Sequence, residues 1–339
     1  MKTTSWKYED GKLKCDSITI DESSIIIKVL YSCICGTDIH NIEKFAREEV
    51  DGVYLGHEFI GEIINSDSKS KLKMGDKVIV NPGVNCGKCV YCKQGYDTYC
   101  LNRKTYGMSS SSDMLGGFSK FLKLNNDTKL HVLPPNVNLR NAVLIEPISV
   151  VLKALNILSN NTKISEKKIA IVGLGPIGII TNLLLKKFKP QKIVSFEIEK
   201  FRIDKSIEFF NIDAMEVSSA FFHEKNKFDI VIDCSGTISG WNTCFDVIKK
   251  GGVLMEIGQF VSGNKLYFDP SVICKKDLKV LGSSLGDDIY YSDALSIINE
   301  FDNELNMLIT HEFKFNELND AFEKAIEKTC FKVVINNEK

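Results

Sequence analysis

Four cysteines crowd into one short stretch of the chain, with the spacing Cys86-x2-Cys89-x2-Cys92-x7-Cys100. Thiolates this close in sequence can converge on one tetrahedral Zn²⁺, and a set of four leaves no position open for a substrate. A redox dithiol or an iron–sulfur cluster is the chemical alternative. We therefore predict a structural zinc in a lobe over residues 86–100. An odd total of 11 cysteines in a chain of this length argues against a disulfide-stapled secreted scaffold.

A glycine-rich turn follows the continuous apolar run Lys168–Val172 and precedes a helix-like segment. In this G-x-G-x-x-G context, Gly173 permits the tight turn, Gly175 lets the backbone approach a pyrophosphate, and Gly178 lets the helix pack close to the sheet. The pyrophosphate would then sit at the positive end of the helix. A glycine turn without a ligand is the alternative. We predict a dinucleotide site that contains Gly173, Gly175, Pro176, Ile177 and Gly178.

An acidic residue, Glu197, ends the next predicted strand. A carboxylate there can accept hydrogen bonds from both hydroxyls of an adenosine ribose and would repel a 2′-phosphate, so NAD is favoured over NADP. Lys200 and Arg202 lie close in sequence and weaken this preference, although Arg202 can instead border the adenine or pair with an acid.

A third set of metal-binding side chains is dispersed along the sequence. It consists of Cys35, His57, Glu58 and Glu146. A catalytic zinc needs about three protein ligands and an open fourth position, and these residue types fit. Taken alone, His57 would more often be a structural histidine, and Glu146, which precedes a proline, would be a helix-start acid.

The elements that must hold these residues change in character along the chain. The first half contains short β-branched runs (24–30, 59–64 and Lys77–Val80), which predict a β-rich domain. From about residue 167, apolar strands alternate with helices, which predicts βαβ units and a parallel sheet. The predicted strands are Lys168–Val172, Lys192–Glu197, Phe228–Asp233, 253–257, 279–283 and 331–335, and the helices are 176–188, Lys200–Phe210, 241–249, 292–305 and 317–328.

The charge balance excludes some classes of partner. The 43 basic and 44 acidic residues give a net charge of −1, without the basic footprint of a nucleic-acid or membrane-surface protein. The polar N-terminus lacks an apolar signal segment, and the glycines, the proline and the polar residues within 169–185 make that run a poor membrane span. We expect a cytoplasmic protein with a small-molecule substrate.

The order and spacing of these motifs resemble the zinc-dependent medium-chain alcohol dehydrogenases. The pair Glu146-Pro147 resembles the polyol, sugar and threonine dehydrogenase branch. The resemblance implies an α/β protein with two domains. A GroES-like β-rich catalytic domain would take residues 1–149 and 290–339, and a Rossmann domain with a doubly wound parallel sheet would take 150–289.

The resemblance also implies roles for individual residues. Cys35, His57 and Glu146 match the catalytic zinc ligands, and Glu58 matches a neighbouring glutamate that either ligates directly or exchanges with water or substrate. The choice between Glu58 and Glu146 in the resting site stays open. The remaining matches are Thr37 and His40 to the proton relay, Glu197 and Arg202 to the adenosine-ribose contacts, and backbone at Ile257, Gly258, Ser283 and Ser284 to the nicotinamide-side contacts.

The implied reaction is hydride transfer between a secondary alcohol (a polyol, sugar or amino-polyol) and NAD, giving a ketone. Oxidation of an amino alcohol, as by L-threonine 3-dehydrogenase, is the alternative within enzymes, and a non-catalytic nucleotide-binding protein is the alternative outside them. The resemblance further implies one catalytic and one structural zinc per chain and a homodimer or homotetramer. The stretch between His40 and Gly56, which borders the expected substrate entry, is rather short for the family.

Overall fold

The chain folds into two compact units. The computed structural model describes residues 1–48, 52–66, 72–218, 224–260 and 268–339, without the side chains of 43–48. One unit comprises Met1–Ser149 and Asp287–Lys339, and the other comprises Val150–Gly286. The second boundary lies three residues before the predicted division at 289/290.

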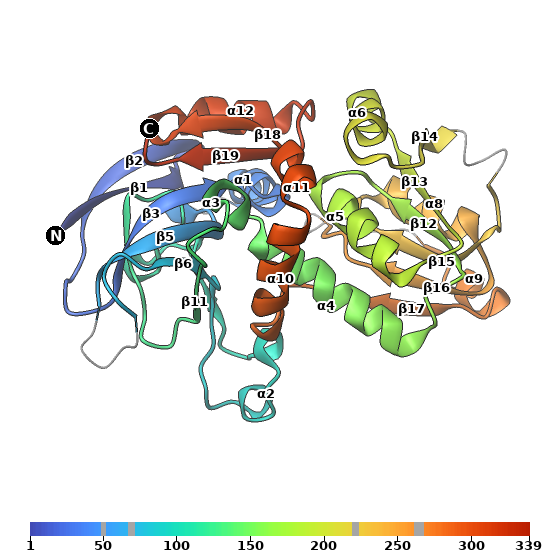
Figure 1. Ribbon diagram of the computed structural model, residues 1–339, viewed down its shortest axis with the longest axis horizontal. Helices are drawn as coiled ribbons and strands as arrows, with labels where there is room; N and C mark the ends of the chain where they lie inside the picture. The colour runs from blue at the N-terminus through green and yellow to red at the C-terminus, as the bar shows by residue number, and fades with distance from the viewer. Residues whose placement is uncertain (49–51, 67–71, 219–223, 261–267) are drawn as a thin grey trace. The chain divides into compact units, whose positions relative to one another are not determined.

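The first unit is built on a seven-stranded sheet that joins both ends of the chain (Figure 1). The blue strand β3 pairs antiparallel with the red strand β19, which lies parallel to β18. The strand order is β11 (Leu130–Val132), β6 (Lys77–Val80), β5 (Glu58–Asn65), β3 (Ile26–Cys33), β19 (Lys332–Asn336) and β18 (Ile309–Lys314), with β10 (Phe121–Lys123) also paired to β3.

A second sheet in this unit begins with a hairpin that the polar N-terminal sequence does not reveal. The sheet contains β2 (Lys12–Thr19), β1 (Lys2–Glu9), β4 (Val53–Leu55) and β9 (Met108–Ser109). Polar residues face inward here because they find partners: the hydroxyls of Ser5 and Ser119 lie 2.6 Å apart and both residues are fully buried. Burial of satisfied polar groups hides the alternation of apolar and polar residues from which a strand is predicted.

The shorter elements of the first unit connect these sheets. Its helices are α1 (Gly36–Glu48), α2 (Val90–Lys93), α3 (Leu139–Ala142), α10 (Ile289–Glu300), α11 (Asp302–Leu308) and α12 (Leu318–Ile326), with 3₁₀ turns at Asp97–Tyr99, Ser112–Met114 and Phe315–Glu317. A small sheet pairs β7 (Gly83–Val84) with β8 (Lys104–Thr105), and α4 (Ile145–Asn161) runs across the boundary into the second unit.

The second unit is a six-stranded parallel sheet with helical crossovers, which confirms the predicted α/β class. Its order is β14 (Ala214–Glu216), β13 (Lys192–Glu197), β12 (Lys168–Val172), β15 (Phe228–Asp233), β16 (Ile248–Glu256) and β17 (Lys279–Gly282). Helices α5 (Pro176–Leu185, continued as a 3₁₀ turn over Lys186–Phe188), α6 (Lys200–Phe210), α8 (Ile238–Val247) and α9 (Ser271–Lys275) connect the strands. In a parallel sheet all carboxyl ends meet at one edge, where ligands bind.

Two helix predictions are wrong in their extent. The helix predicted over 241–249 ends at Val247, because Ile248 is already extended (ψ 132°) and pairs with Phe228 as the first residue of β16. The helix predicted over 292–305 is two helices, α10 and α11, separated at Phe301. Phe301 leaves the helical region (φ −115°, ψ 30°), and this conformation ends α10.

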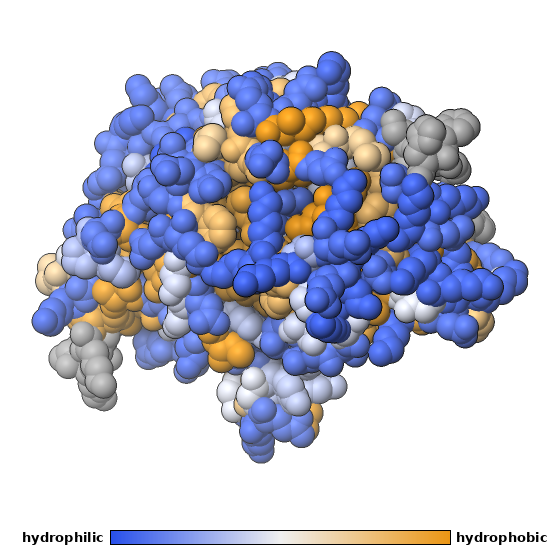
Figure 2. All heavy atoms as spheres, turned by 45° about the vertical axis from the view of Figure 1, so that its right-hand side comes forward, coloured by the Kyte–Doolittle hydropathy of each residue, from blue (hydrophilic) through white to orange (hydrophobic). Residues whose placement is uncertain are grey.

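The face drawn in Figure 2 is mostly hydrophilic, and apolar side chains show in patches between the hydrophilic ones. No helix within the described part of the chain is both long and apolar enough to cross a bilayer.

Candidate active site

The four clustered cysteines converge. Their sulfur atoms all lie within 4.8 Å of one another. A tetrahedral zinc with Zn–S bonds of about 2.3 Å would separate its sulfur ligands by roughly 3.8 Å, so the group fits such an ion with little movement. The pair Cys89 and Cys92 is already close, with sulfur atoms 3.4 Å apart.

The backbone around this lobe favours thiolates. Hydrogen bonds from the backbone amides of Lys88 and Cys89 lower the pKa of Cys86 to about 6. The backbone amides of Cys92 and Leu101 likewise lower the pKa of Cys89. Burial, together with its cysteine neighbours, raises the pKa of Cys92 to about 12. Because a metal ion binds deprotonated sulfur, the lobe offers thiolates that are partly prepared for it.

A second group brings together three of the dispersed candidates. The sulfur of Cys35, a ring nitrogen of His57 and a carboxylate oxygen of Glu58 lie within 4.8 Å of one another. Cys35 immediately precedes α1, and Glu58 begins β5. Gly56 makes the turn into this segment with φ +89°, a conformation that favours glycine. A thiolate, an imidazole and a carboxylate form a donor set that fits a catalytic zinc.

Asp38, to which the sequence assigned no role, organises this group. Its carboxylate is fully buried and accepts hydrogen bonds from the backbone amides of Cys35 (3.0 Å) and Gly56 (3.2 Å). It also lies 3.5 Å from Nδ1 of His57. Burial disfavours the imidazolium, but the charges of Asp38 and Cys35 outweigh it and raise the pKa of His57 well above its usual value. A carboxylate behind a metal-binding histidine fixes the orientation of the ring.

Lys332 is the second residue that the sequence did not indicate. Its ammonium group donates to Oε1 of Glu58 at 2.6 Å and also bonds Oε2, and the side chains are only 3% and 1% exposed. Burial opposes the charge of Lys332, but Glu58 and nearby Cys35 outweigh it and raise its pKa. No local pattern could reveal this pair, because the partners are 274 residues apart in the sequence.

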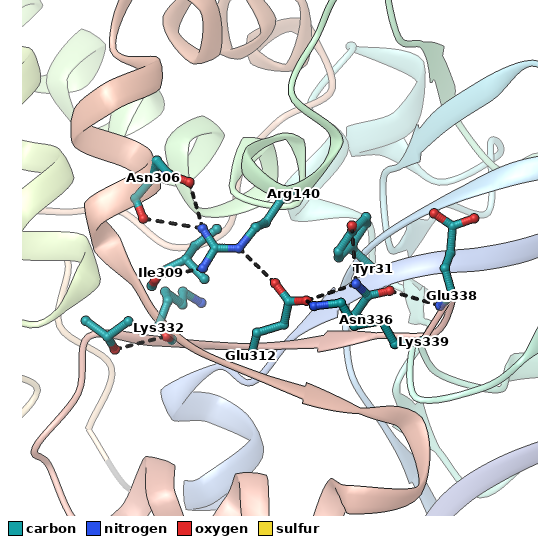
Figure 3. Close-up of polar contacts among 10 residues, drawn as sticks. Tyr31, Arg140, Asn306, Ile309, Glu312, Lys332, Asn336, Glu338 and Lys339 are labelled. Atoms are coloured by element: carbon teal, nitrogen blue, oxygen red, sulfur yellow. Dashed lines mark hydrogen bonds and ion pairs between the residues drawn. The ribbon is translucent and has the colours of Figure 1, made fainter.

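A polar network holds the strands that carry Lys332. Arg140 of α3 donates to Oε2 of Glu312 (3.0 Å), to the carbonyl of Ile309 (2.9 Å) and to Oδ1 of Asn306 (2.8 Å). The other oxygen of Glu312 accepts from Nδ2 of Asn336 at 2.9 Å (Figure 3). These bonds fix β18 and β19 to α3, so Lys332 has a rigid base.

Glu146 lies near this group but outside it. The atoms that approach within 4.8 Å belong to Cys35, His57 and Glu58. Burial raises the pKa of Glu146 to about 7. The charge of Glu58 also raises this pKa, whereas the charge of His57 lowers it. The structure therefore places Glu146 within electrostatic range of the candidate ligands, on the first turn of α4.

Thr37 and His40 lie on the first turns of α1, three residues apart. Residues at this spacing face the same side of a helix. Both side chains are partly exposed.

The glycine turn has the shape that a pyrophosphate requires. Gly173 adopts φ +93°, and a Cβ on Gly178 would lie 2.0 Å from the carbonyl oxygen of Gly173. Gly175 caps α5 immediately before Pro176 and Ile177, and of the residues that the structure describes a Cβ there would meet only Arg202, at 3.8 Å. The open space above Gly175 at a helix N-terminus fits a phosphate.

Glu197 is held in place at the end of β13. Its Oε1 accepts from the amides of Ile198 (2.7 Å) and Glu199 (3.1 Å), and its Oε2 accepts from Leu174 (2.8 Å). Arg202 approaches Oε2 at 3.9 Å. A carboxylate accepts about four hydrogen bonds, so Oε2 retains capacity for a ribose hydroxyl.

The candidate nicotinamide-side residues gather at the ends of β15, β16 and β17. The amides of Ile257 and Gly258 donate to the carbonyl of Asp233, and that of Ser283 donates to Glu256. The carbonyl of Ser284 accepts from the buried ammonium group of Lys153 at 3.2 Å. The amides of Ile257, Gly258 and Ser283 are thus used within the fold.

Comparison with known families decides what these sites belong to. Residues 21–135 match the family described as "Alcohol dehydrogenase GroES-like domain", and residues 139–336 match "Glucose dehydrogenase C-terminus". The chain belongs to the zinc-dependent medium-chain alcohol dehydrogenase family. A medium-chain dehydrogenase is an oxidoreductase that uses zinc and a nicotinamide cofactor, and the two donor groups and the glycine turn fit those ligands.

Relatives of this medium-chain dehydrogenase cover nearly the whole chain. A sorbitol dehydrogenase from Halalkalibacterium halodurans is 29% identical over 94% of this chain and 92% of its own length. D-arabinitol dehydrogenase 1 from Uromyces fabae is 25% identical over 95% and 93%. Among solved structures, L-idonate 5-dehydrogenase from Escherichia coli shares the fold with a TM-score of 0.84, at 23% identity over 99% of this chain and 98% of that one.

Proposed function

We propose that this chain oxidises a secondary alcohol of a polyol or sugar to a ketone, with NAD as hydride acceptor. The observation that carries the proposal is the convergence of Cys35, His57 and Glu58 in a chain of a zinc-dependent dehydrogenase family. Relatives named for sorbitol and D-arabinitol support the substrate class.

Cys35 and His57, with Glu58 or Glu146 as the carboxylate, would hold the catalytic zinc. When bound, this ion acts as a Lewis acid that makes an alcohol hydroxyl easier to deprotonate. Asp38 keeps the ring of His57 oriented toward the metal side. The buried ammonium group of Lys332 neutralises Glu58 and fixes its carboxylate beside Cys35 and His57.

Thr37 and His40 would carry the alcohol proton toward solvent. Their shared helix side and partial exposure suit a short relay that begins at the substrate hydroxyl and ends at an imidazole. Glu58 matches a family glutamate that either ligates the metal or exchanges with water or substrate, and it would have the same role here.

The second unit would bind NAD. The turn Gly173–Gly178 would take the pyrophosphate, Glu197 the ribose hydroxyls, and Arg202 the border of the adenosine. A buried carboxylate disfavours a 2′-phosphate, which supports NAD over NADP. The cofactor's nicotinamide ring accepts the hydride, while the protein supplies its orientation.

A panel of polyols, L-threonine and simple alcohols, assayed with NAD and NADP at alkaline pH, tests this function. We expect NADH formation that is fastest with a polyol and is abolished by complete removal of zinc. Cys35→Ser should abolish turnover while the melting temperature stays close to that of the wild type. Faster turnover of L-threonine than of sorbitol or xylitol would favour the amino-alcohol alternative. Activity that survives complete zinc removal would refute the mechanism.

Metal analysis of two matched variants tests the third ligand. Glu58→Gln and Glu146→Gln each remove one carboxylate charge, and the variant that loses catalytic zinc identifies the resting ligand. A second zinc, held by the four-cysteine lobe, should remain bound in both variants. Size-exclusion chromatography with light scattering tests the expected homodimer or homotetramer.

A further inference from the structure

Two carboxyl groups lie side by side at the carboxyl ends of β15 and β16. Asp233 and Glu256 are paired in the register of these parallel strands, so their side chains point to the same face. Asp233 is fully buried, and its Oδ2 and both carboxylate oxygens of Glu256 are buried without a hydrogen-bond partner in the described part of the chain. Buried polar atoms in native proteins are almost always satisfied. One proton between the two groups would satisfy oxygens on both.

The electrostatic surroundings favour such a proton. Burial, and then the charge of Asp233, raises the pKa of Glu256 to about 9. Burial also raises the pKa of Asp233, although the Ser235 side chain and amide oppose it. Two further titratable groups lie within electrostatic range of the pair, Cys234 at the end of β15 and Cys244 on α8. Burial raises the pKa of both thiols, so both are uncharged between pH 7 and 9.

The main chain of this pair supports the candidate nicotinamide contacts. The carbonyl of Asp233 accepts from the amides of Ile257 (3.0 Å) and Gly258 (2.9 Å), and the carbonyl of Glu256 accepts from Ser283 (2.9 Å). The two strand ends are packed backbone against backbone, since a Cβ on Gly258 would lie 2.4 Å from the amide nitrogen of Gly236. A repulsion between the two side chains would therefore displace these contacts.

We propose that Glu256 is a positioning residue for the cofactor: one proton shared with Asp233 holds the ends of β15 and β16 together and keeps their backbone in the binding geometry. Loss of this proton creates a second buried negative charge, which separates the strand ends and weakens cofactor binding. This inference rests on the proposed use of a nicotinamide cofactor.

Melting curves of the cofactor-free protein between pH 5 and 10 test the shared proton without reference to the reaction. In the unfolded chain Glu256 ionises near pH 4.5, whereas the native protein keeps the proton up to about pH 9. The native state then binds more protons in this window, so the wild type loses stability as pH rises from 4.5 to 9 and levels off above it. Glu256→Gln cannot ionise. Its advantage in melting temperature over the wild type should be near zero at pH 5 and grow up to pH 9.

A matched control makes this comparison specific. Glu216 also ends a strand of the same sheet, but it is exposed. Glu216→Gln removes the same charge and should follow the wild type at every pH. Asp233→Asn removes the partner's charge and provides a second variant if Glu256→Gln folds poorly. Its gain should have the same sign but be smaller, because burial still raises the pKa of Glu256.

The affinity for NADH, measured by fluorescence, tests the link to the cofactor. With a pKa of about 9, only about one protein in ten keeps the proton at pH 10, so the apparent Kd of the wild type should rise about tenfold between pH 8 and 10. The Kd of Glu256→Gln should stay constant over this range. Equal pH slopes for wild type and Glu256→Gln, or a melting advantage that does not change with pH, would overturn the inference. Failure of the wild type to bind NADH at any pH would instead refute the proposed cofactor. The melting curves would still show whether Glu256 and Asp233 share a proton.

Discussion

The buried pair of Lys332 and Glu58 predicts a large and metal-dependent loss of stability in Lys332→Met. Methionine keeps the apolar length of the side chain but leaves the charge of Glu58 uncompensated, in a place where the two side chains are only 3% and 1% exposed. Removing one partner of a buried ion pair typically costs about 3–5 kcal/mol. Since 1 kcal/mol shifts the Tm of a domain of 150–250 residues by about 2–4 °C, the Tm should fall by roughly 6–20 °C.

The effect of added zinc and the effect of a second substitution distinguish this electrostatic cost from a simple loss of packing. In Lys332→Met the carboxylate of Glu58 loses its counter-ion beside the sulfur of Cys35 and the ring of His57, so a zinc ion bound there should recover part of the lost stability. Lys332→Met combined with Glu58→Gln removes both charges and should be more stable than Lys332→Met alone.

Urea unfolding of the metal-free and zinc-loaded proteins measures both effects. Lys324→Met is the control, because Lys324 pairs with Glu327 at the surface, where the side chains are 26% and 57% exposed and an ion pair contributes at most about 1 kcal/mol. The reasoning would be refuted if metal-free Lys332→Met were as stable as the wild type. It would also be refuted if the double variant lost as much unfolding free energy as the two single variants together.

Three further perturbations follow from the sites. Cys89→Ser should lower zinc content and Tm, because binding of a structural zinc contributes to the folding free energy, about 10–16 kcal/mol in isolated zinc-finger peptides and less in a large domain. Cys274→Ser, at an exposed cysteine, is the control. An unchanged Tm of Cys89→Ser would count against the structural zinc site. Glu197→Ala should weaken NADH binding roughly tenfold and reduce the preference for NADH over NADPH, as measured by fluorescence titration. Unaltered affinity for both cofactors would place the ribose contact elsewhere. Gly178→Ala puts a Cβ 2.0 Å from the carbonyl oxygen of Gly173 and should abolish NADH binding in calorimetry, whereas wild-type affinity would show that the turn is not the pyrophosphate site.

Sequence reasoning works well in this chain where the determinants are local. Strands β12, β13 and β15 are buried over most of their length and are therefore rich in apolar residues, and their predicted bounds agree with the structure. The four cysteines of the lobe lie within one loop, so the spacing alone limits how far apart their sulfur atoms can be. The glycine turn is likewise a property of consecutive residues.

Sequence reasoning fails where polar groups are satisfied by distant partners. The hairpin β1–β2 buries Ser5 against Ser119, which conceals its inward face. Helix 241–249 is too long because the pairing of Ile248 with Phe228, a tertiary contact, outweighs local helix preference.

The amino-acid sequence by itself determined the α/β class, the clustering of the four cysteines and the glycine turn, because each depends on periodicity or on neighbours in the chain. Only the tertiary structure decided that Asp38 lies beside the ring of His57, that Lys332 neutralises Glu58, and that Glu256 meets Asp233. Burial brings these charges from separate strands into a medium of low dielectric constant, where their pairing and protonation depend on distances that no sequence pattern contains.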